Sequence, residues 1–314
     1  MKVFKFGGAS VKDAEGVKNL SSIVRGQHGQ LIVVVSAMGK TTNLLETLCN
    51  AYFHRDSKTV AIVEELKNFH LGIVNSLFPL NDPIYKNLDE LFTSLGNILN
   101  TESSLCYDYE YDRIISFGEL ISTTIISHYL RLKNIDNLFI DIRKHLKTDQ
   151  NYRNGNIDLE LSGQLCEEAF DFKNTTIYVT QGFIAGTRTN QTTTLGREGS
   201  DYTAALLANL LNAEDVTIWK DVPGVMNADP KEYDKAQVIS KMSYKEAIEL
   251  SHFGAKVIHP KTIKPIQNKQ SPLYVKSFLH PESSGTIIEE IDEYLKLPPI
   301  YINKGNQCLL TLTP

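Results

Sequence analysis

The sequence has few cysteines, and no two of them lie close together. Four occur in 314 residues, at Cys49, Cys106, Cys166 and Cys308, without the short spacings that zinc sites and CxxC redox motifs need. No acidic cluster marks a metal site either. These absences favour buried thiols in a reducing compartment and predict that the chain itself holds no metal.

Two further absences limit what the protein binds. No apolar run reaches the roughly 18 residues of a membrane span, and the strand-like KVFKF follows Met1 directly, without the pattern of a targeting peptide. With 32 Lys and Arg against 37 Asp and Glu, the chain has no basic excess for nucleic acid. We expect a cytoplasmic protein that binds neither membranes nor nucleic acid, with any phosphate site confined to a local cluster of cations.

What the sequence does contain is a regular alternation of short apolar runs with amphipathic stretches, in a chain that is 42% hydrophobic. Strands that alternate with helices favour an α/β fold with a mainly parallel sheet covered by helices on both faces. We also expect two lobes around a cleft. The predicted strands are Val3–Phe6, Leu31–Ser36, Leu138–Asp141, Ile177–Thr180, Val216–Trp219 and Tyr274–Phe278.

Several stretches carry the spacing of apolar residues that is typical of helices. Thr42 to Leu99 is largely helical by this pattern, with a break between Pro79 and Pro83, because proline in a helix interior loses a hydrogen bond. Helices are also predicted over Ser116–Leu132, over Tyr244–Phe253 and after Pro260.

Two segments are expected to be loops. Asn151–Gly163 is polar, and Gly182–Asp201 is rich in Gly, Thr and Arg before a helix predicted over Tyr202–Leu211. Irregular segments of the second kind often carry function, so we expect binding residues within it.

The first candidate site is KFGGAS, in which Lys5 and two glycines follow a strand and precede a helix. The backbone N–H groups of Gly7 and Gly8 can face a phosphate, with Lys5 as a cation beside them. A purely structural turn explains the glycines equally well.

The second candidate site is VVVSAMGKTTN, which superficially resembles a Walker A loop but has Val34 where the first glycine is required. Ser36 and Thr42 remain as hydroxyl donors at the carboxyl end of a strand, where open α/β sheets bind ligands. A role for Thr42 as a helix cap is equally plausible from the pattern.

Two further segments combine charges with helix starts. Glu119 begins the helix of FGELIS, where it either holds an ammonium group or complements the helix dipole. In TTLGREGSDYTAALLA, Ser200 or Asp201 can cap the next helix, but capping does not explain Arg197 among glycines. Ligand binding is favoured there, because an arginine can hold a carboxylate in bidentate fashion.

The remaining candidates are lysines near turns. Lys220 and Asp221 end the strand of IWKDVPGVMNADP, where either a nucleotide contact or a solvated loop fits. Lys256 in FGAKVIHPK follows a helix and a glycine, which by itself favours a partner for the helix dipole.

Taken in order, these segments resemble the successive motifs of the aspartate kinases within the amino-acid kinase family, from Met1 to about Thr286: KFGGAS, VSAMG, FGELIS, TTLGREGSDYTAALLA, WKDVPGVMNADP and FGAKVIHP. The resemblance implies a three-layer αβα sandwich with a mainly parallel central sheet. It also implies an enzyme that transfers the γ-phosphoryl group of ATP to the side-chain carboxylate of L-aspartate, the first step of lysine, threonine and methionine biosynthesis.

The resemblance also implies roles for the candidate residues. Lys5 and Asp201 would be catalytic, with Asp201 orienting Lys5 or the substrate, and the amino-terminal lobe would hold aspartate. Aspartate would be bound by Ser36, Thr42, Glu119, Arg197 and Ser200. ATP, with Mg²⁺ carried on its phosphates, would be bound by Lys5, Gly7, Gly8, Lys220, Asp221, Met226, Lys231, Lys256 and Val257.

The chain departs from the family pattern at several positions. Ala9 and Lys220 replace common threonines, Met226 replaces a common tyrosine, and Lys231 replaces an arginine, which removes a bidentate grip on phosphate. These changes affect the expected adenine contacts rather than the reaction class.

The expected domain division is a catalytic domain over residues 1–290 and a short remainder over 291–314. Tyr301 to Thr313 is predicted to form a strand or short hairpin, interpreted as the first strand of a truncated regulatory ACT domain. In the full-length protein the family resemblance implies a homo-oligomer, and a fused homoserine dehydrogenase stays open.

Two other functions are compatible with the sequence. A kinase for another amino-acid carboxylate would share most of the motifs, and a non-catalytic amino-acid or nucleotide sensor would share the fold. The presence of both Lys5 and Asp201 favours an enzyme.

Overall fold

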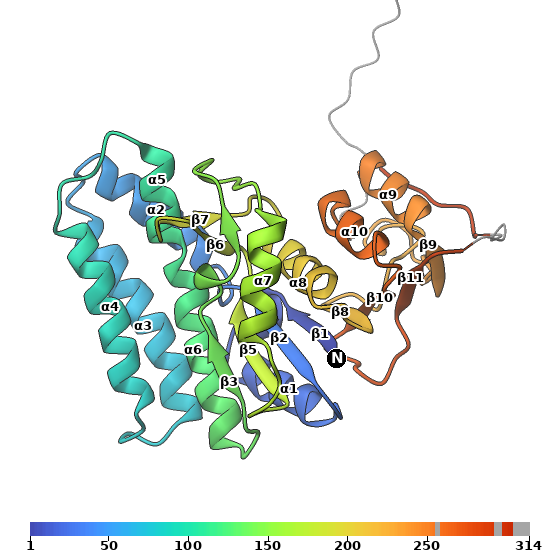
Figure 1. Ribbon diagram of the computed structural model, residues 1–314, viewed down its shortest axis with the longest axis horizontal. Coiled ribbons are helices and arrows are strands. Elements are labelled where there is room, and N and C mark those ends of the chain that lie inside the picture. Colours follow the sequence, from blue (N-terminus) through green and yellow to red (C-terminus); the bar gives the residue numbers. More distant parts are fainter. Residues whose placement is uncertain (255–257, 292–296, 304–314) are drawn as a thin grey trace, which may run out of the picture.

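The computed structural model describes residues 1–254, 258–291 and 297–303. Within these ranges the main sheet has eight strands in the order β3-β5-β2-β1-β8-β10-β11-β9. Neighbouring strands run parallel except β10 and β11. Helices lie on both faces (Figure 1), which confirms the expected αβα sandwich. The strands are β1 (Lys2–Phe6), β2 (Leu31–Val35), β3 (Leu138–Ile140), β5 (Ile177–Gln181), β8 (Asp215–Lys220), β9 (Lys241–Ser243), β10 (Leu273–Ser277) and β11 (Thr286–Glu289).

The centre of the sheet is built from continuous apolar runs. Every residue of β2, LIVVV, is buried, as expected for a parallel strand with helices on both sides. In β1, Lys5 pairs in register with Val34 on one side and with Ile218 on the other. The carboxyl ends of β1, β2 and β8 therefore lie level at one edge of the sheet.

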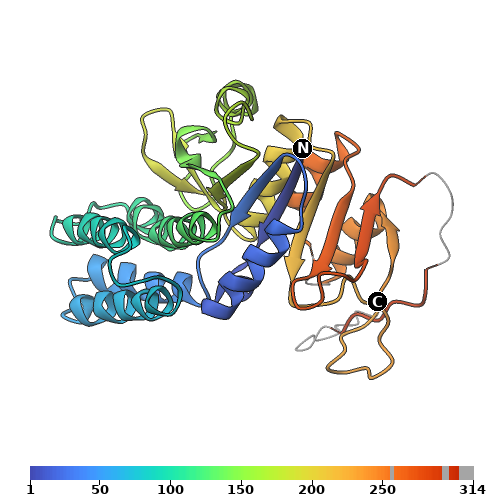
Figure 2. The same ribbon diagram turned by 90° about the horizontal axis from the view of Figure 1, so that it is seen from below.

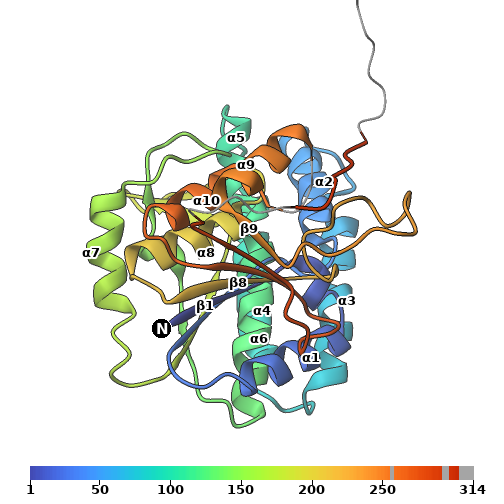
Figure 3. The ribbon, with the colours of Figure 1, turned by 90° about the vertical axis from the view of Figure 1, so that its right-hand side faces the viewer.

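Different helices cover the two faces. α6 (Phe117–Leu132) contacts β2, β3 and β5, and α1 (Ala14–Arg25) packs beside it. α8 (Gly199–Leu210) contacts β1, β2 and β8, flanked by α7 (Leu159–Ala169) and α10 (Pro260–Gln267). Figure 3 shows α8 and α10 on one side of β1 and β8, with α1 on the other.

A helical layer stands beyond α6 (Figures 1 and 2). It consists of α2 (Thr41–Phe53), α3 (Thr59–Leu77), α4 (Ile84–Leu99) and α5 (Tyr107–Ile115). The expected helical stretch with a proline break is confirmed, since α3 ends at Leu77 and α4 begins directly after Pro83. The sequence patterns had not indicated α5.

The two segments expected to be loops are more ordered than predicted. Within Gly182–Asp201, β6 (Ile184–Thr187) and β7 (Thr192–Thr194) form a hairpin, and β4 (Lys147–Thr148) completes a small sheet. The polar segment Asn151–Gly163 ends early, because the Asp158 side chain accepts a hydrogen bond from the Leu161 N–H and caps α7. Short strands of Thr and Gly carry too weak an apolar pattern to be recognised.

The carboxyl-terminal part packs beside β8 and contains α9 (Tyr244–Phe253), α10, β10 and β11. The expected helix over Tyr244–Phe253 is confirmed, and Ser243 and Glu246 form a capping box at its start. The predicted strand or hairpin over Tyr301–Thr313 lies outside the described residues from position 304 onward, and residues 301–303 form no strand. None of the described helices is both long and apolar enough to span a bilayer.

Candidate active site

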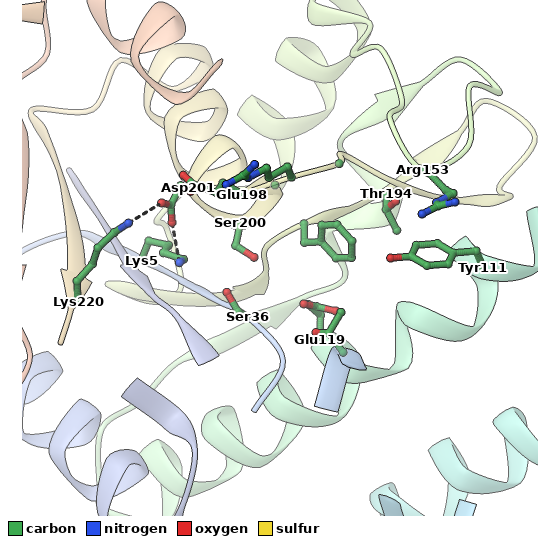
Figure 4. A pocket seen from close by; sticks show the side chains of 15 residues that line it. Lys5, Ser36, Tyr111, Glu119, Arg153, Thr194, Glu198, Ser200, Asp201 and Lys220 are labelled. Atoms are coloured by element: carbon green, nitrogen blue, oxygen red, sulfur yellow. Dashed lines mark ion pairs between the residues drawn. The ribbon is translucent and has the colours of Figure 1, made fainter. Parts of the chain in front are cut away.

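A cavity of about 460 Å³ opens at the carboxyl ends of β1, β2 and β8 (Figure 4). It collects predicted residues from five separate motifs: Lys5, Ser36, Thr42, Glu119, Arg197, Ser200, Asp201 and Lys220. Residues that the sequence patterns did not single out complete the lining: Tyr111, Arg153, Phe183, Thr194, Gly196, Glu198 and Gly199. The structure thus brings most of the candidate side chains into one space.

A buried carboxylate between two lysines forms one end of the cavity. Asp201 lies in the first turn of α8, with Oδ1 2.6 Å from the Lys5 Nζ and Oδ2 3.6 Å from the Lys220 Nζ. Burial opposes ionisation of Asp201, but the Lys5 and Lys220 ammonium groups outweigh it and lower its pKa below the ordinary value. Two cations held by one anion leave a net positive charge that suits a phosphate group.

Gly7 and Gly8 shape the loop that follows Lys5. A side chain at Gly7 would come within 3.1 Å of the Lys5 Nζ. A Cβ at Gly8 would lie 2.8 Å from the Ala37 carbonyl oxygen, and the Gly8 carbonyl accepts a hydrogen bond from the Gly39 N–H. Close approach of the loop after β2 therefore requires glycine at position 8, whereas a side chain at position 7 would crowd the Lys5 ammonium group. A short 3₁₀ helix over Gly8–Val11 separates this loop from α1.

Glu119 places a second buried carboxyl group in the cavity. It lies in the first turn of α6 and is only 2% exposed. Its Oε1 accepts a hydrogen bond of 3.0 Å from the Ala37 N–H, while Oε2 is buried without a hydrogen-bond partner among the described residues. Burial raises the pKa of Glu119 to about 8. An unpaired carboxyl oxygen that faces a cavity is suited to a ligand cation.

The start of α8 differs from the expected capping pattern. Ser200 and Asp201 lie inside the first turn, and the cap position is taken by Glu198, whose side chain makes no capping hydrogen bond. The backbone of Glu198 is left-handed, with φ of 52°, and its Oε2 is buried without a partner among the described residues. Thr42 does not cap α2 either, because Lys40 occupies that position.

The other end of the cavity is formed by residues that sequence reasoning missed. Tyr111 comes from α5, Arg153 from the loop before α7 and Thr194 from β7. Figure 4 shows Tyr111 and Arg153 across the cavity from Lys5 and Lys220, with Glu119 and Ser36 between them. An arginine between Tyr152 and Asn154 in a polar loop was the only local signal, and nothing in the sequence connected it to Tyr111.

Lys261, in the first turn of α10, bridges the two loops of this end. Its Nζ donates hydrogen bonds to the Asn154 Oδ1 at 3.0 Å and to the Leu195 carbonyl at 2.9 Å. The same ammonium lies 4.7 Å from the ring centre of Tyr202. A helix of the carboxyl-terminal part is thereby bonded to segments adjacent to Arg153 and Arg197.

Some predicted nucleotide residues do not line the cavity. Asp221 and Lys231 are exposed, and Met226 is half-buried in an isolated bridge with Val238. Lys256 and Val257 lie outside the described residues. Within the described ranges, no three His, Cys, Asp or Glu side chains form a group that could hold a metal ion.

The fold and the cavity define an α/β protein that gathers cations and buried carboxyl groups at the carboxyl ends of parallel strands. This arrangement suits an enzyme that brings two anionic substrates together. Residues 1–277 match the model of the amino acid kinase family, and the chain belongs to that family.

Several relatives of the chain are aspartokinases. The chain is 32% identical to lysine-sensitive aspartokinase 3 of Escherichia coli, over 99% of the chain and 69% of that protein. It is 35% identical to the bifunctional aspartokinase/homoserine dehydrogenase of Buchnera aphidicola, over 92% of the chain and 36% of that protein. The crystal structure of E. coli aspartokinase III in complex with aspartate and ADP superimposes with a TM-score of 0.85 and 31% identity.

The chain is shorter than these relatives. The superposition with the crystallised E. coli chain includes 93% of the present chain but 65% of that chain. It spans about a third of the bifunctional relatives it matches.

Proposed function

We propose that this protein phosphorylates the side-chain carboxylate of L-aspartate with ATP and forms 4-phospho-L-aspartate and ADP. The observation that carries the proposal is the unpaired, buried oxygen of Glu119 in the same cavity as the Lys5–Asp201–Lys220 cluster. One group suits the ammonium of an amino acid, and the other suits phosphate. The E. coli relative with aspartate and ADP supports the same pair of ligands.

The acceptor, L-aspartate, is held in the part of the cavity that Glu119 lines. Glu119 binds the ammonium group of aspartate, and the hydroxyls of Ser36, Thr42 and Ser200 contact its polar atoms. Arg197 supplies a cation near the start of α8, where the helix dipole also favours an anion. The side-chain carboxylate then points toward Lys5.

Phosphoryl transfer here needs no strong base, because the acceptor carboxylate is already ionised at neutral pH. An oxygen of this carboxylate attacks the γ-phosphorus of ATP, and the bond from that phosphorus to the bridging oxygen of ADP breaks. Lys5 neutralises charge on the transferring group, and Asp201 holds the Lys5 ammonium in place. Mg²⁺ enters with ATP, bound mainly by the phosphate oxygens.

The donor nucleotide lies toward Lys220 and the glycine loop. Gly7 and Gly8 have no side chains of their own to cover their backbone N–H groups, and Lys220 lies on the Lys5 side of the cavity. Asp221, Met226, Lys231, Lys256 and Val257 remain the proposed contacts of the nucleotide beyond its phosphates.

We include the domain division in this proposal, with residues 1–290 as the catalytic domain. The last strand of the main sheet, β11, ends at Glu289. Loss of aspartate-dependent turnover in a chain ending at residue 290 would contradict this boundary.

The test is ADP release with MgATP and L-aspartate, run beside L-glutamate. We expect turnover with aspartate and a loss of at least about 100-fold in kcat for Lys5→Ala. The matched control is Lys18→Ala, because Lys18 is an exposed lysine that pairs with Glu15 and lies outside this cavity. Faster turnover with glutamate would reassign the acceptor, and ATP binding without turnover on any amino acid would favour a sensor.

A further inference from the structure

The loop between β8 and β9 begins at the edge of the cavity and carries three of the proposed nucleotide contacts. It covers residues 221–240 and follows directly on Lys220, which lines the cavity. Asp221, Met226 and Lys231 all belong to this β8–β9 loop. The contacts that fix the conformation of the loop therefore govern whether these three side chains can reach one nucleotide together.

The base of the loop is bonded to the sheet, but its tip is not. The Val225 N–H donates a hydrogen bond of 2.8 Å to the Thr286 hydroxyl on β11. The Asn227 N–H donates one of 3.0 Å to the Gln237 carbonyl across the loop. Within the described ranges, the hydrogen bonds of the tip, residues 228–236, stay inside the loop with one exception.

A segment from beyond the main sheet supports the loop from outside. Residues 297–303, which we call the strap, lie beside the β8–β9 loop (Figure 2). The Tyr301 N–H donates a hydrogen bond of 2.7 Å to the Asn227 carbonyl. The Asn227 Nδ2 in turn donates one of 3.0 Å to the Pro299 carbonyl. The main chain of the strap is thus bonded to the loop on both sides of Ile300.

Two side-chain contacts extend the strap over the tip of the loop. The rings of Tyr301 and Tyr233 stack, with centres 5.7 Å apart and an angle of 24° between their planes. The Asn303 Nδ2 donates a hydrogen bond of 2.9 Å to the Glu232 Oε2, which is the exception among the bonds of the tip. The two tyrosines are 54% and 42% exposed, so their stack joins two surface segments and fills no core.

The strap is itself anchored to the body of the molecule. Leu297 and Ile300 pack against the hydrophobic core. Together with Leu250 and Phe253 of α9 they line one groove. The two prolines between Leu297 and Ile300 also restrict the backbone of the strap. A short, stiff segment therefore connects the tip of the loop to a fixed part of the structure.

We propose that the strap is a positioning element for the nucleotide, and that the ring of Tyr301 holds the β8–β9 loop in the conformation that binds MgATP. This inference rests on the proposed function. The strap bonds to Asn227, which adjoins Met226, and to Tyr233, two residues after Lys231. A loop that is already ordered binds its ligand more tightly, because binding does not have to order it.

The test measures initial rates of ADP release while MgATP and L-aspartate are varied separately. In Tyr301→Ala we expect the KM for MgATP to rise by about 5-fold, the scale of one stacked aromatic pair. The kcat and the KM for aspartate should stay within about 2-fold of wild type, because the change acts on nucleotide binding alone. Tyr301→Phe should keep the wild-type KM, since it retains the ring and the backbone hydrogen bond.

Two further variants isolate the stack. Tyr233→Ala should raise the KM for MgATP about as much as Tyr301→Ala, and the double variant should equal either single one, because both remove the same contact. The matched control is Tyr85→Ala, since Tyr85 lies on α4, bonds to Asn75 and is outside both the loop and the cavity.

Trypsin cleavage gives a second readout that needs no turnover. Lys231 and Lys235 are exposed on the β8–β9 loop, and cleavage after them is identified by mass spectrometry of the full chain. We expect cleavage about 5-fold faster in Tyr301→Ala, because a loop that opens more often is cut more often. MgATP should slow cleavage in the wild type, and higher concentrations should be needed in the variant.

Three results would overturn this inference while the proposed function stands. They are an unchanged KM for MgATP in Tyr301→Ala, an equal rise in the KM for aspartate, and effects of the two tyrosine substitutions that add in the double variant. Absence of wild-type turnover with aspartate overturns the proposed function, and trypsin then decides the inference. Cleavage that is the same in wild type and Tyr301→Ala, or that MgATP does not slow in the wild type, overturns it.

Discussion

Aspartate binding should depend on pH through Glu119. Burial raises the pKa of this carboxyl group to about 8, so the free protein carries it mainly protonated at neutral pH. Pairing with the ammonium of aspartate requires the ionised form, which the bound cation stabilises. The affinity for aspartate should therefore rise with pH and level off above about pH 8.

The magnitude follows from the fraction of Glu119 that is ionised before binding. With a pKa of about 8, this fraction is about 1% at pH 6, about 9% at pH 7 and about 50% at pH 8. The affinity should increase by about 10-fold over the first interval and by about 5-fold over the second. Binding at pH 7 should release about 0.9 proton per aspartate.

Calorimetry with L-aspartate measures both quantities, because titrations in phosphate and Tris buffers report the released protons through their different ionisation heats. Glu119→Gln should bind aspartate about 30-fold more weakly at pH 8, from loss of about 2 kcal/mol of charge-assisted hydrogen bonding, and without pH dependence. A wild-type affinity that is constant from pH 6 to 8, with no proton release, would refute the assignment of Glu119 to the ammonium group.

Three further substitutions test the geometry of the cavity. Asp201→Asn should lower kcat by about 100-fold while the protein stays folded, because two facing lysines lose the anion that holds them; a kcat near wild type would contradict the positioning role. Glu198→Gly should raise the thermal unfolding midpoint, since glycine relieves about 1 kcal/mol of left-handed backbone strain. The same change should lower the KM for MgATP, because it removes a negative charge from the cavity. A rise in this KM would show that Glu198 binds substrate. Asp112→Asn should lower the free energy of unfolding in urea by about 2 kcal/mol, because three hydrogen bonds lose their charged acceptor. It should also raise the KM for aspartate more than the KM for MgATP. Equal effects on both KM values would count against a local role of Asp112.

The sequence was sufficient to predict the parts of the fold that depend on strong local patterns. β2 is a continuous run of buried β-branched residues and Leu, and its position and type were predicted from that run. The small sheet was missed because β6 has the sequence Ile-Ala-Gly-Thr, in which Ile184 is the one large apolar residue, so that the strand has little apolar periodicity. α5 was missed because Tyr107–Ile115 alternates tyrosine with charged residues.

The candidate site was predictable where the residues belong to ordered motifs. Lys5, Glu119 and Asp201 come from separate motifs, and the structure places them in one cavity. Arg153 could not be predicted, because its place in the cavity depends on contacts with Tyr111 and Asp112, which lie about forty residues earlier in the chain. Local sequence gives no information about such a pairing. Asp221, Met226 and Lys231 were placed by motif alone, and none of them lines this cavity.

The bonds of Lys261 couple the position of α10 to the two loops at the Arg153 end of the cavity. One ammonium group joins α10 to the side chain of Asn154 and to the carbonyl of Leu195. A shift of α10 must therefore either break these two hydrogen bonds or move the loops that contain Asn154 and Leu195. Ordering of those loops by aspartate must then slow amide exchange in α10, and any partner that displaces α10 must weaken aspartate binding by the same free energy. The position of α10, a helix of the carboxyl-terminal part, is thus energetically coupled to the acceptor site.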